Sequence, residues 1–160
     1  MHSLSQALLE WLSQYHFYVT VMAPLAALIY CNVRLKEFYI LKDFSWLTLS
    51  IPLSYMFSYW KDGNSALIIS PVCMVIVVVS AYFKKSWTLT QAFTLSYTTL
   101  LTVDLTMAYK MHYPNDGWAF LTGIGGAGWQ DGLIIFPMVT LFFVIYINSR
   151  RKGKLDLTLI

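Results

Sequence analysis

Long apolar runs separated by short polar stretches dominate the sequence. A helix that crosses about 30 Å of hydrocarbon needs about 20 mostly apolar residues. Five runs approach that length. We therefore predict an all-α fold, a polytopic membrane bundle in which residues 15–149 form five transmembrane helices. The predicted spans cover residues 17–32, 44–60, 66–83, 88–109 and 132–148.

The composition supports a membrane protein. Hydrophobic residues make up 58% of the chain and charged residues 12%, whereas soluble domains are about 45–50% apolar and about 25% charged. This chain has too few charges to cover a surface that faces water. The lipid bilayer is therefore its first predicted partner.

The basic residues predict an orientation. The first loop, the third loop and the C-terminal tail (residues 150–160) carry nine Lys and Arg, whereas the remaining loops and the N-terminal tail carry two. Positive loops stay in the cytoplasm, so we expect the N-terminus outside and the C-terminus inside a cell inner membrane. A basic cluster directly after an apolar run anchors a helix at lipid head groups more often than it binds nucleic acid. The predicted anchoring residues are Arg150, Arg151, Lys152 and Lys154.

The first 14 residues contain leucines at helical spacing, at positions 4, 8, 9 and 12. This pattern is typical of an amphipathic helix that lies on the outer membrane surface. The same residues also suit the first turns of a long first span. Both interpretations stay open, with the surface helix favoured.

The longest predicted loop, residues 110–131, contains a glycine-rich stretch. Gly123, Gly125 and Gly128 match the G-x-G-x-x-G pattern of dinucleotide-binding turns. That site requires a parallel sheet, which five spans leave no room to build, so we predict no cofactor. Three roles remain for the glycines: a turn that re-enters the membrane, a close approach of two backbones, or a flexible outer loop.

The same loop holds a candidate interaction surface. Tryptophans at this height mark a membrane interface or form a binding face. The four-residue spacing of His112 and Asp116 would suit a metal on a helix, but we expect Pro114 to break that helix, so no metal site is predicted. The candidate residues are His112, Asp116, Trp118, Gly125, Gly128, Trp129 and Asp131.

Asp104 lies inside the fourth predicted span. A charged side chain there costs about 2.5–3.5 kcal/mol and by default marks a functional site. The span also carries hydroxyl side chains, among them Thr99, Thr102 and Thr106. These hydroxyls suit either a hydrated path for a proton or ion, or a helix–helix seam held by small polar side chains. The seam is the favoured interpretation.

Asp131 is expected at a similar depth, where it would cap the fifth helix. The stretch Gly128-Trp129-Gln130-Asp131 also resembles the Gly-x-Gly-Asp motif of intramembrane aspartyl proteases. That resemblance implies catalytic roles for Asp104 and Asp131. Gln130 replaces the second glycine of the motif, which permits close approach to the substrate backbone, and this departure puts the activity in doubt.

The sequence contains no complete catalytic set, and it favours a function without catalysis. We expect a membrane protein that blocks, gates or scaffolds another membrane process, in the manner of exclusion or immunity proteins that stop phage DNA, plasmid DNA or a toxin. Its partner would be another membrane protein or a second copy of the chain. The alternatives are a small transporter or channel subunit that uses Asp104, and the aspartyl protease.

Overall fold

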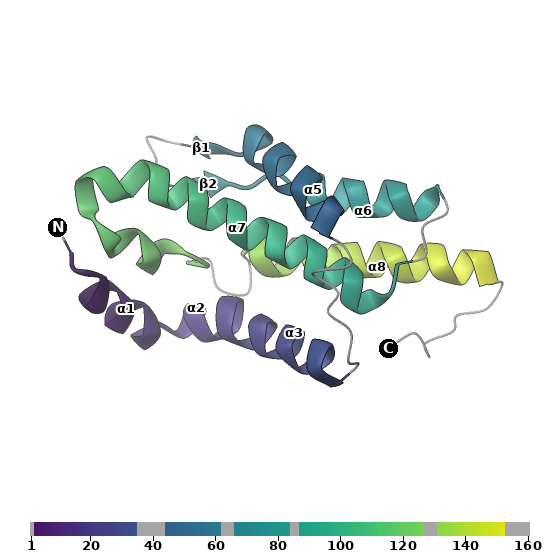
Figure 1. Cartoon of the computed structure of the whole chain (residues 1–160), viewed down its shortest axis with the longest axis horizontal. Coiled ribbons are helices and arrows are strands. Elements are labelled where there is room, and N and C mark those ends of the chain that lie inside the picture. Colours follow the sequence, from purple (N-terminus) through teal and green to yellow (C-terminus); the bar gives the residue numbers. More distant parts are fainter. Residues whose placement is uncertain (1, 35–43, 62–65, 84–86, 127–130, 153–160) are drawn as a thin grey trace.

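The computed structural model describes residues 2–34, 44–61, 66–83, 87–126 and 131–152. These residues are mostly helical, as the all-α prediction requires, with one antiparallel pair of short strands (Figure 1). The elements are α1 (Leu4–Ser13), α2 (Tyr15–Phe17), the π-helix η1 (Tyr18–Met22), α3 (Ala23–Arg34), α5 (Phe44–Phe57), β1 (Tyr59–Lys61), β2 (Ala66–Ile68), α6 (Val72–Tyr82), α7 (Leu89–Asp116), the 3₁₀-helix η2 (Trp118–Gly123) and α8 (Gly132–Lys152).

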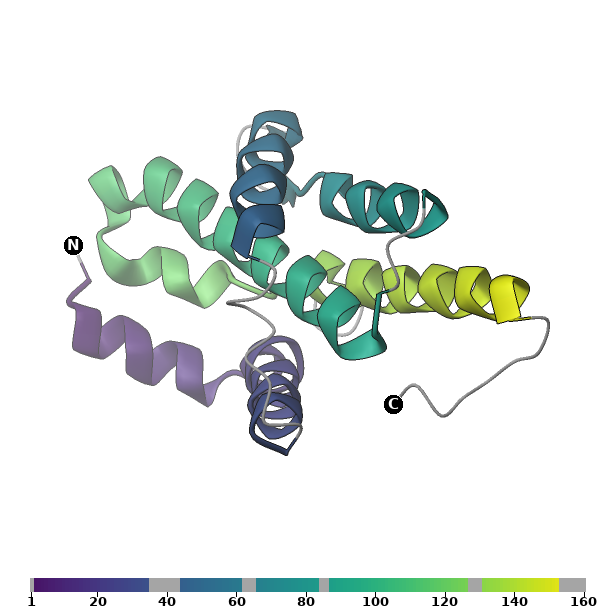
Figure 2. The same cartoon turned by 45° about the vertical axis from the view of Figure 1, so that its right-hand side comes forward.

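The long helix α7 is the centre of the bundle, and it packs against α3, α5, α6, η2 and α8. At one end of the molecule lie the start of α7 and the last residues of α6 and α8 (Figures 1 and 2). We call this the basic end, because Arg150 and Arg151 close α8 there. The opposite end holds α1, η2 and the two strands, and we call it the head.

The first helix is separate from the one that follows. Ser3 and Gln6 form a capping box at the start of α1, and Gln14, with φ −87° and ψ 133°, interrupts the chain after Ser13. Ala7 is buried, whereas Leu9 is 70% exposed. The structure therefore favours a separate N-terminal helix over a prolonged first span, and its location at a membrane surface stays a prediction.

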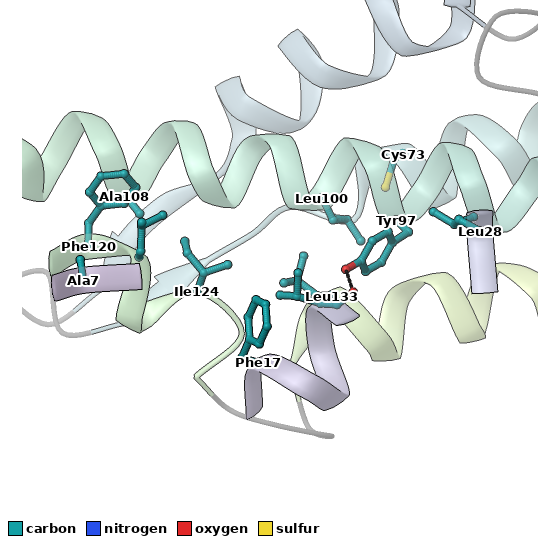
Figure 3. Packing of buried hydrophobic residues seen from close by; sticks show 12 residues of the cluster. Ala7, Phe17, Leu28, Cys73, Tyr97, Leu100, Ala108, Phe120, Ile124 and Leu133 are labelled. Carbon is teal, nitrogen blue, oxygen red and sulfur yellow. Dashed lines mark hydrogen bonds between the residues drawn. The ribbon is translucent and has the colours of Figure 1, made fainter. Parts of the chain in front are cut away.

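Pro24 lies at the start of α3, which directly follows η1, and α7 supplies a hydrogen bond to the carbonyl that this proline leaves free. Proline has no N–H to donate to the carbonyl four residues earlier, which here belongs to Thr20. The backbone widens into a π-helix just before this point, and the buried Tyr97 hydroxyl donates to the Thr20 carbonyl at 2.7 Å. A longer bond of 3.4 Å reaches Val21 (Figure 3). A neighbouring helix thus supplies the donor that Pro24 removes, as expected for a proline within a membrane span.

The second and third predicted spans differ from the structure. Helix α5 ends at Phe57, strands β1 and β2 pair, and α6 begins only after Pro71. With 14 and 11 residues, α5 and α6 measure about 21 Å and about 16 Å. The prediction of continuous helix over residues 58–60 and 66–71 is wrong because strand-forming residues there pair with each other, and because Pro71 suits the start of a helix.

The predicted outer loop is also largely helical. Helix α7 continues through Pro114 to Asp116, and η2 follows directly. Pro114 lies in the last turn of α7, where it removes only the hydrogen bond to the Lys110 carbonyl. The helix ends instead at Gly117, whose φ of 60° favours glycine. The prediction that Pro114 breaks the helix is therefore wrong.

Two helices among the described residues are long and apolar enough to cross a membrane, Tyr15–Val33 and Gly132–Arg151. The prediction of five spans is thus not confirmed. Only 22% of each apolar window is buried, unlike the mostly buried core helix of a soluble protein. Their outward side chains include Ile29, 63% exposed, and Phe142, 67% exposed. Among the described residues, the buried polar side chains are Thr20, Ser50, Ser54, Ser58, Thr94, Ser96, Thr99, Asp104 and Thr140.

Candidate functional site

The site begins with the segment that follows α7. After Gly117 the chain runs back beside the end of α7 as η2 and places Phe120, Leu121 and Ile124 in the core (Figure 3). Trp118 joins an aromatic cluster with Tyr113, at 5.3 Å between ring centroids, and with Phe120, at 5.8 Å. In the described part of the glycine-rich stretch, residues 122–126, Ile124 and Gly125 are buried, whereas Gly123 and Gly126 are exposed.

Position 125 requires glycine for two reasons, its backbone conformation and its close contact with Thr20. Its φ is +72°, and a Cβ atom at this position would lie 2.8 Å from the Thr20 Cβ and still nearer the Thr20 hydroxyl. The Gly125 backbone thus packs closely against the Thr20 side chain, and the three roles predicted for the glycines stay predictions. Gly128 and Trp129 lie outside the described residues.

The N-terminal helices hold this returning segment in place. Trp11 donates its indole N–H to the Ile124 carbonyl at 3.4 Å, and His16 Nε2 lies 3.2 Å from the Thr122 carbonyl oxygen. The backbone of His2 pairs with the turn at Gly117. These contacts join residues more than 100 positions apart and make the head a packed unit.

A cavity of about 830 Å³ opens in the head. Its walls come from the second half of α7, the strand pair, the returning segment and the first turns of α8. Four ionisable side chains from the described residues line it, and none of them is Lys or Arg. They are Asp104, His112, Asp116 and Asp131.

Asp104 is the most enclosed of the four, with 8% of its surface exposed. Its carboxyl group faces the backbone N–H of Gly125 and interacts electrostatically with Asp131. The sequence predicted a similar depth for the two acids, and the structure brings them to one cavity. The tight turn at Gly125 thus also positions a donor for Asp104.

Asp131 caps α8, as the sequence predicted. One carboxylate oxygen accepts a hydrogen bond from the backbone N–H of Leu133 at 2.9 Å. The positive end of the helix dipole favours an anion at this position. Asp131 therefore has a structural role, and it adds negative charge to the cavity wall.

His112 and Asp116 form a pair on the last turns of α7. The distance between His112 Nδ1 and Asp116 Oδ2 is 3.7 Å. The Trp60 and His112 rings are nearly perpendicular, with 5.0 Å between their centroids. Sequence reasoning missed Trp60 because the strand that carries it was predicted as helix. Within the described residues, no three His, Cys, Asp or Glu side chains are close enough to hold a metal ion.

The hydroxyl residues of α7 do not form one line with Asp104. Thr99 is buried, and its hydroxyl bonds that of Ser50 on α5 at 2.7 Å. Thr102 and Thr106 instead donate to carbonyls of their own helix, and Thr106 is exposed. The Thr99 contact fits a helix–helix seam.

The basic residues at the other end make contacts within the protein. Arg151 donates to the Tyr82 carbonyl at the end of α6, at 2.9 Å. Arg150 donates to the Tyr146 hydroxyl at 3.1 Å. Arg151 thus ties α6 to α8, and the predicted lipid anchoring stays a prediction. The Lys152 side chain and Lys154 lie outside the described residues.

Comparisons of this chain with protein-family profiles, with curated proteins and with solved structures find no match.

Proposed function

We propose that this chain is a small multi-pass protein of a cell inner membrane, with its head outside and its basic end in the cytoplasm. The observation that carries this proposal is the distribution of side chains: large apolar residues such as Met56, 73% exposed, and Phe142 face outward, whereas eight serines and threonines of the described residues are buried in the bundle together with apolar residues. Lipid-facing surfaces are apolar, and helix contacts inside membranes use small polar residues. All five apolar segments enter the bilayer in this arrangement, with α5 and α6 shorter than a full span.

We further propose that the protein acts by interaction and without catalysis. Trp11 of α1, His16 of α2 and Thr20 of η1 contact the segment that follows α7. These contacts hold the head together, so it presents a preformed surface. Preformed surfaces bind partners with little ordering cost. The head would block, gate or scaffold another membrane process, as exclusion and immunity proteins do, through another membrane protein or a second copy of the chain.

The test is a challenge of bacteria that express the chain with a panel of phages and conjugative plasmids. Adsorption and DNA uptake are scored separately, and membrane fractions establish that the protein is inserted. We expect uptake to fall while adsorption stays normal, and we expect a Gly125→Val variant, which disturbs the head, to lose this protection. Normal uptake across the whole panel, with the protein in the membrane, would contradict the proposal.

One observation favours a second function, that of a small transporter or channel subunit. Asp104 is buried at a cavity wall together with Asp131, and ionisable residues in such positions often serve ion or proton pathways. The pairing of the two acids also suits the aspartyl protease, although Asp131 already caps α8. Asp104→Asn separates these functions from exclusion: it should abolish flux or proteolysis and leave exclusion unchanged.

A further inference from the structure

The cavity in the head has the size and the mixed walls of a small-molecule site. Ligand pockets measure about 300–1,000 Å³ and combine apolar walls with a few polar groups. This cavity measures about 830 Å³, and apolar side chains such as Ile135 and Phe136 share its walls with Asp104. A ligand can occupy it whether or not the chain blocks DNA uptake, so this inference goes beyond the proposed function.

The charge of the lining sets the sign of the ligand. Asp104, Asp116 and Asp131 contribute carboxyl groups, His112 is the one basic side chain among the described lining residues, and it already pairs with Asp116. The Asp104 carboxyl group interacts electrostatically with Asp131, and a cation beside Asp104 would stabilise its charged form. The cavity therefore favours a positively charged ligand over a neutral or negative one.

The walls favour an organic cation over a metal ion. Metal sites need several ligands that converge on one point, and the described residues contain no such group. Trp60 lines the same cavity and offers an aromatic surface, which attracts organic cations. We propose that this cavity binds a lipophilic organic cation, with Asp104 facing the charge and Trp60 and Ile135 contacting the apolar groups.

The test uses the purified full chain in lipid nanodiscs with tetraphenylphosphonium as the probe. Tetraphenylborate, which has the same shape and the opposite charge, is the matched control ligand. We expect saturable binding of the cation, measured by equilibrium dialysis, and no saturable binding of the anion. Equal binding of both ions, or no saturable binding of the cation, would overturn the proposal.

Three variants locate the binding site. Asp104→Asn removes the charge with little change in shape and should weaken cation binding by about tenfold or more. Glu10→Gln makes the same chemical change on the exposed face of α1, away from the cavity, and should leave binding unchanged. Ile135→Trp keeps every acid and fills the cavity, so it should also reduce binding, and it decides the question if Asp104→Asn does not fold. Unchanged affinity in a folded Asp104→Asn or Ile135→Trp variant would overturn the assignment.

Discussion

Helices α7 and α8 pack along each other, yet α7 buries more of its residues, and more polar ones, than α8 does. Helix α8 buries one narrow face, with Leu133, Thr140 and Val144 at helical spacing, and exposes large apolar residues on the other side. Helix α7 buries ten residues, and four of them are Thr94, Ser96, Thr99 and Asp104. The more polar of the two helices is therefore the more buried one.

The difference follows from position in the bundle. Helix α7 contacts neighbours on most sides, whereas α8 packs chiefly on α6 and α7 (Figure 2). In water the central helix of a bundle is the most apolar one, because burial of apolar surface drives folding. Within a lipid environment the outer surface is apolar as well, and small polar residues allow the central helix to approach its neighbours and bond to them. Each of the following variants tests this contrast.

The largest effect is expected from an acid on the outer face of α8. Phe142 is 67% exposed and lies near the middle of the helix. If that face contacts lipid, Phe142→Asp should cost about 2.5–3.5 kcal/mol of insertion free energy. The fraction of chains inserted is measured in a membrane-insertion assay with Phe142→Leu as the control. Equal insertion of the Phe142→Asp and Phe142→Leu variants would place this face in water and remove the contrast between the helices.

A smaller loss is expected where the returning segment covers the second half of α7. Gly125→Ala places a Cβ against Thr20 at a backbone conformation with positive φ, and it should destabilise the protein by about 2 kcal/mol. Gly123→Ala is the matched control, because its added Cβ would meet no atom within 4 Å. Thermal unfolding in detergent compares the two variants. Equal melting temperatures would show that the head does not depend on this close contact.

The sequence alone predicts two features of this fold, the long apolar helices and the cap of α8. Apolar length predicted the helices around Ile29 and Phe142, because a long uninterrupted apolar run has few other stable structures in a membrane. The cap at Asp131 was predictable as well, because capping depends on residues close in sequence. The proteolytic, transport and exclusion functions considered from the sequence remain proposals.

The head could not be predicted in the same way. Its contacts join Thr20 to Gly125 and Trp60 to His112, and no local pattern specifies such distant pairs. The strand pair had a local signal, the Asp62-Gly63 dipeptide between β1 and β2 in the sequence, which is typical of hairpins. The span prediction used apolar length alone, so it missed the strand pair and the position of Trp60 in the cavity wall.

The next variant removes a bond that α7 makes to the helix with Pro24. Tyr97→Phe leaves the Thr20 carbonyl without its 2.7 Å hydroxyl donor, and it should cost about 1–2 kcal/mol of unfolding free energy. Pro24→Ala restores a backbone N–H, so the loss should be smaller in that background. Chemical unfolding of the four chains in a double-mutant cycle measures the coupling. Additive effects would mean that Tyr97 does not serve the carbonyl that Pro24 leaves free.

The smallest effect is expected at the seam between α5 and α7. The Ser50 and Thr99 hydroxyls bond at 2.7 Å in a buried position, and such bonds inside membranes contribute on average about 0.6 kcal/mol. Ser50→Ala, Thr99→Ala and the double variant should give a coupling of that size by equilibrium unfolding. Thr106, exposed on the same helix, is the control, because Thr106→Ala should not couple to Ser50→Ala. A coupling at Ser50 and Thr99 with none at Thr106 would mean that the polar residues of α7 stabilise the bundle where they are buried. No coupling at either position would mean that the Ser50–Thr99 bond does not stabilise the contact between α5 and α7, and the seam interpretation would fail for this pair.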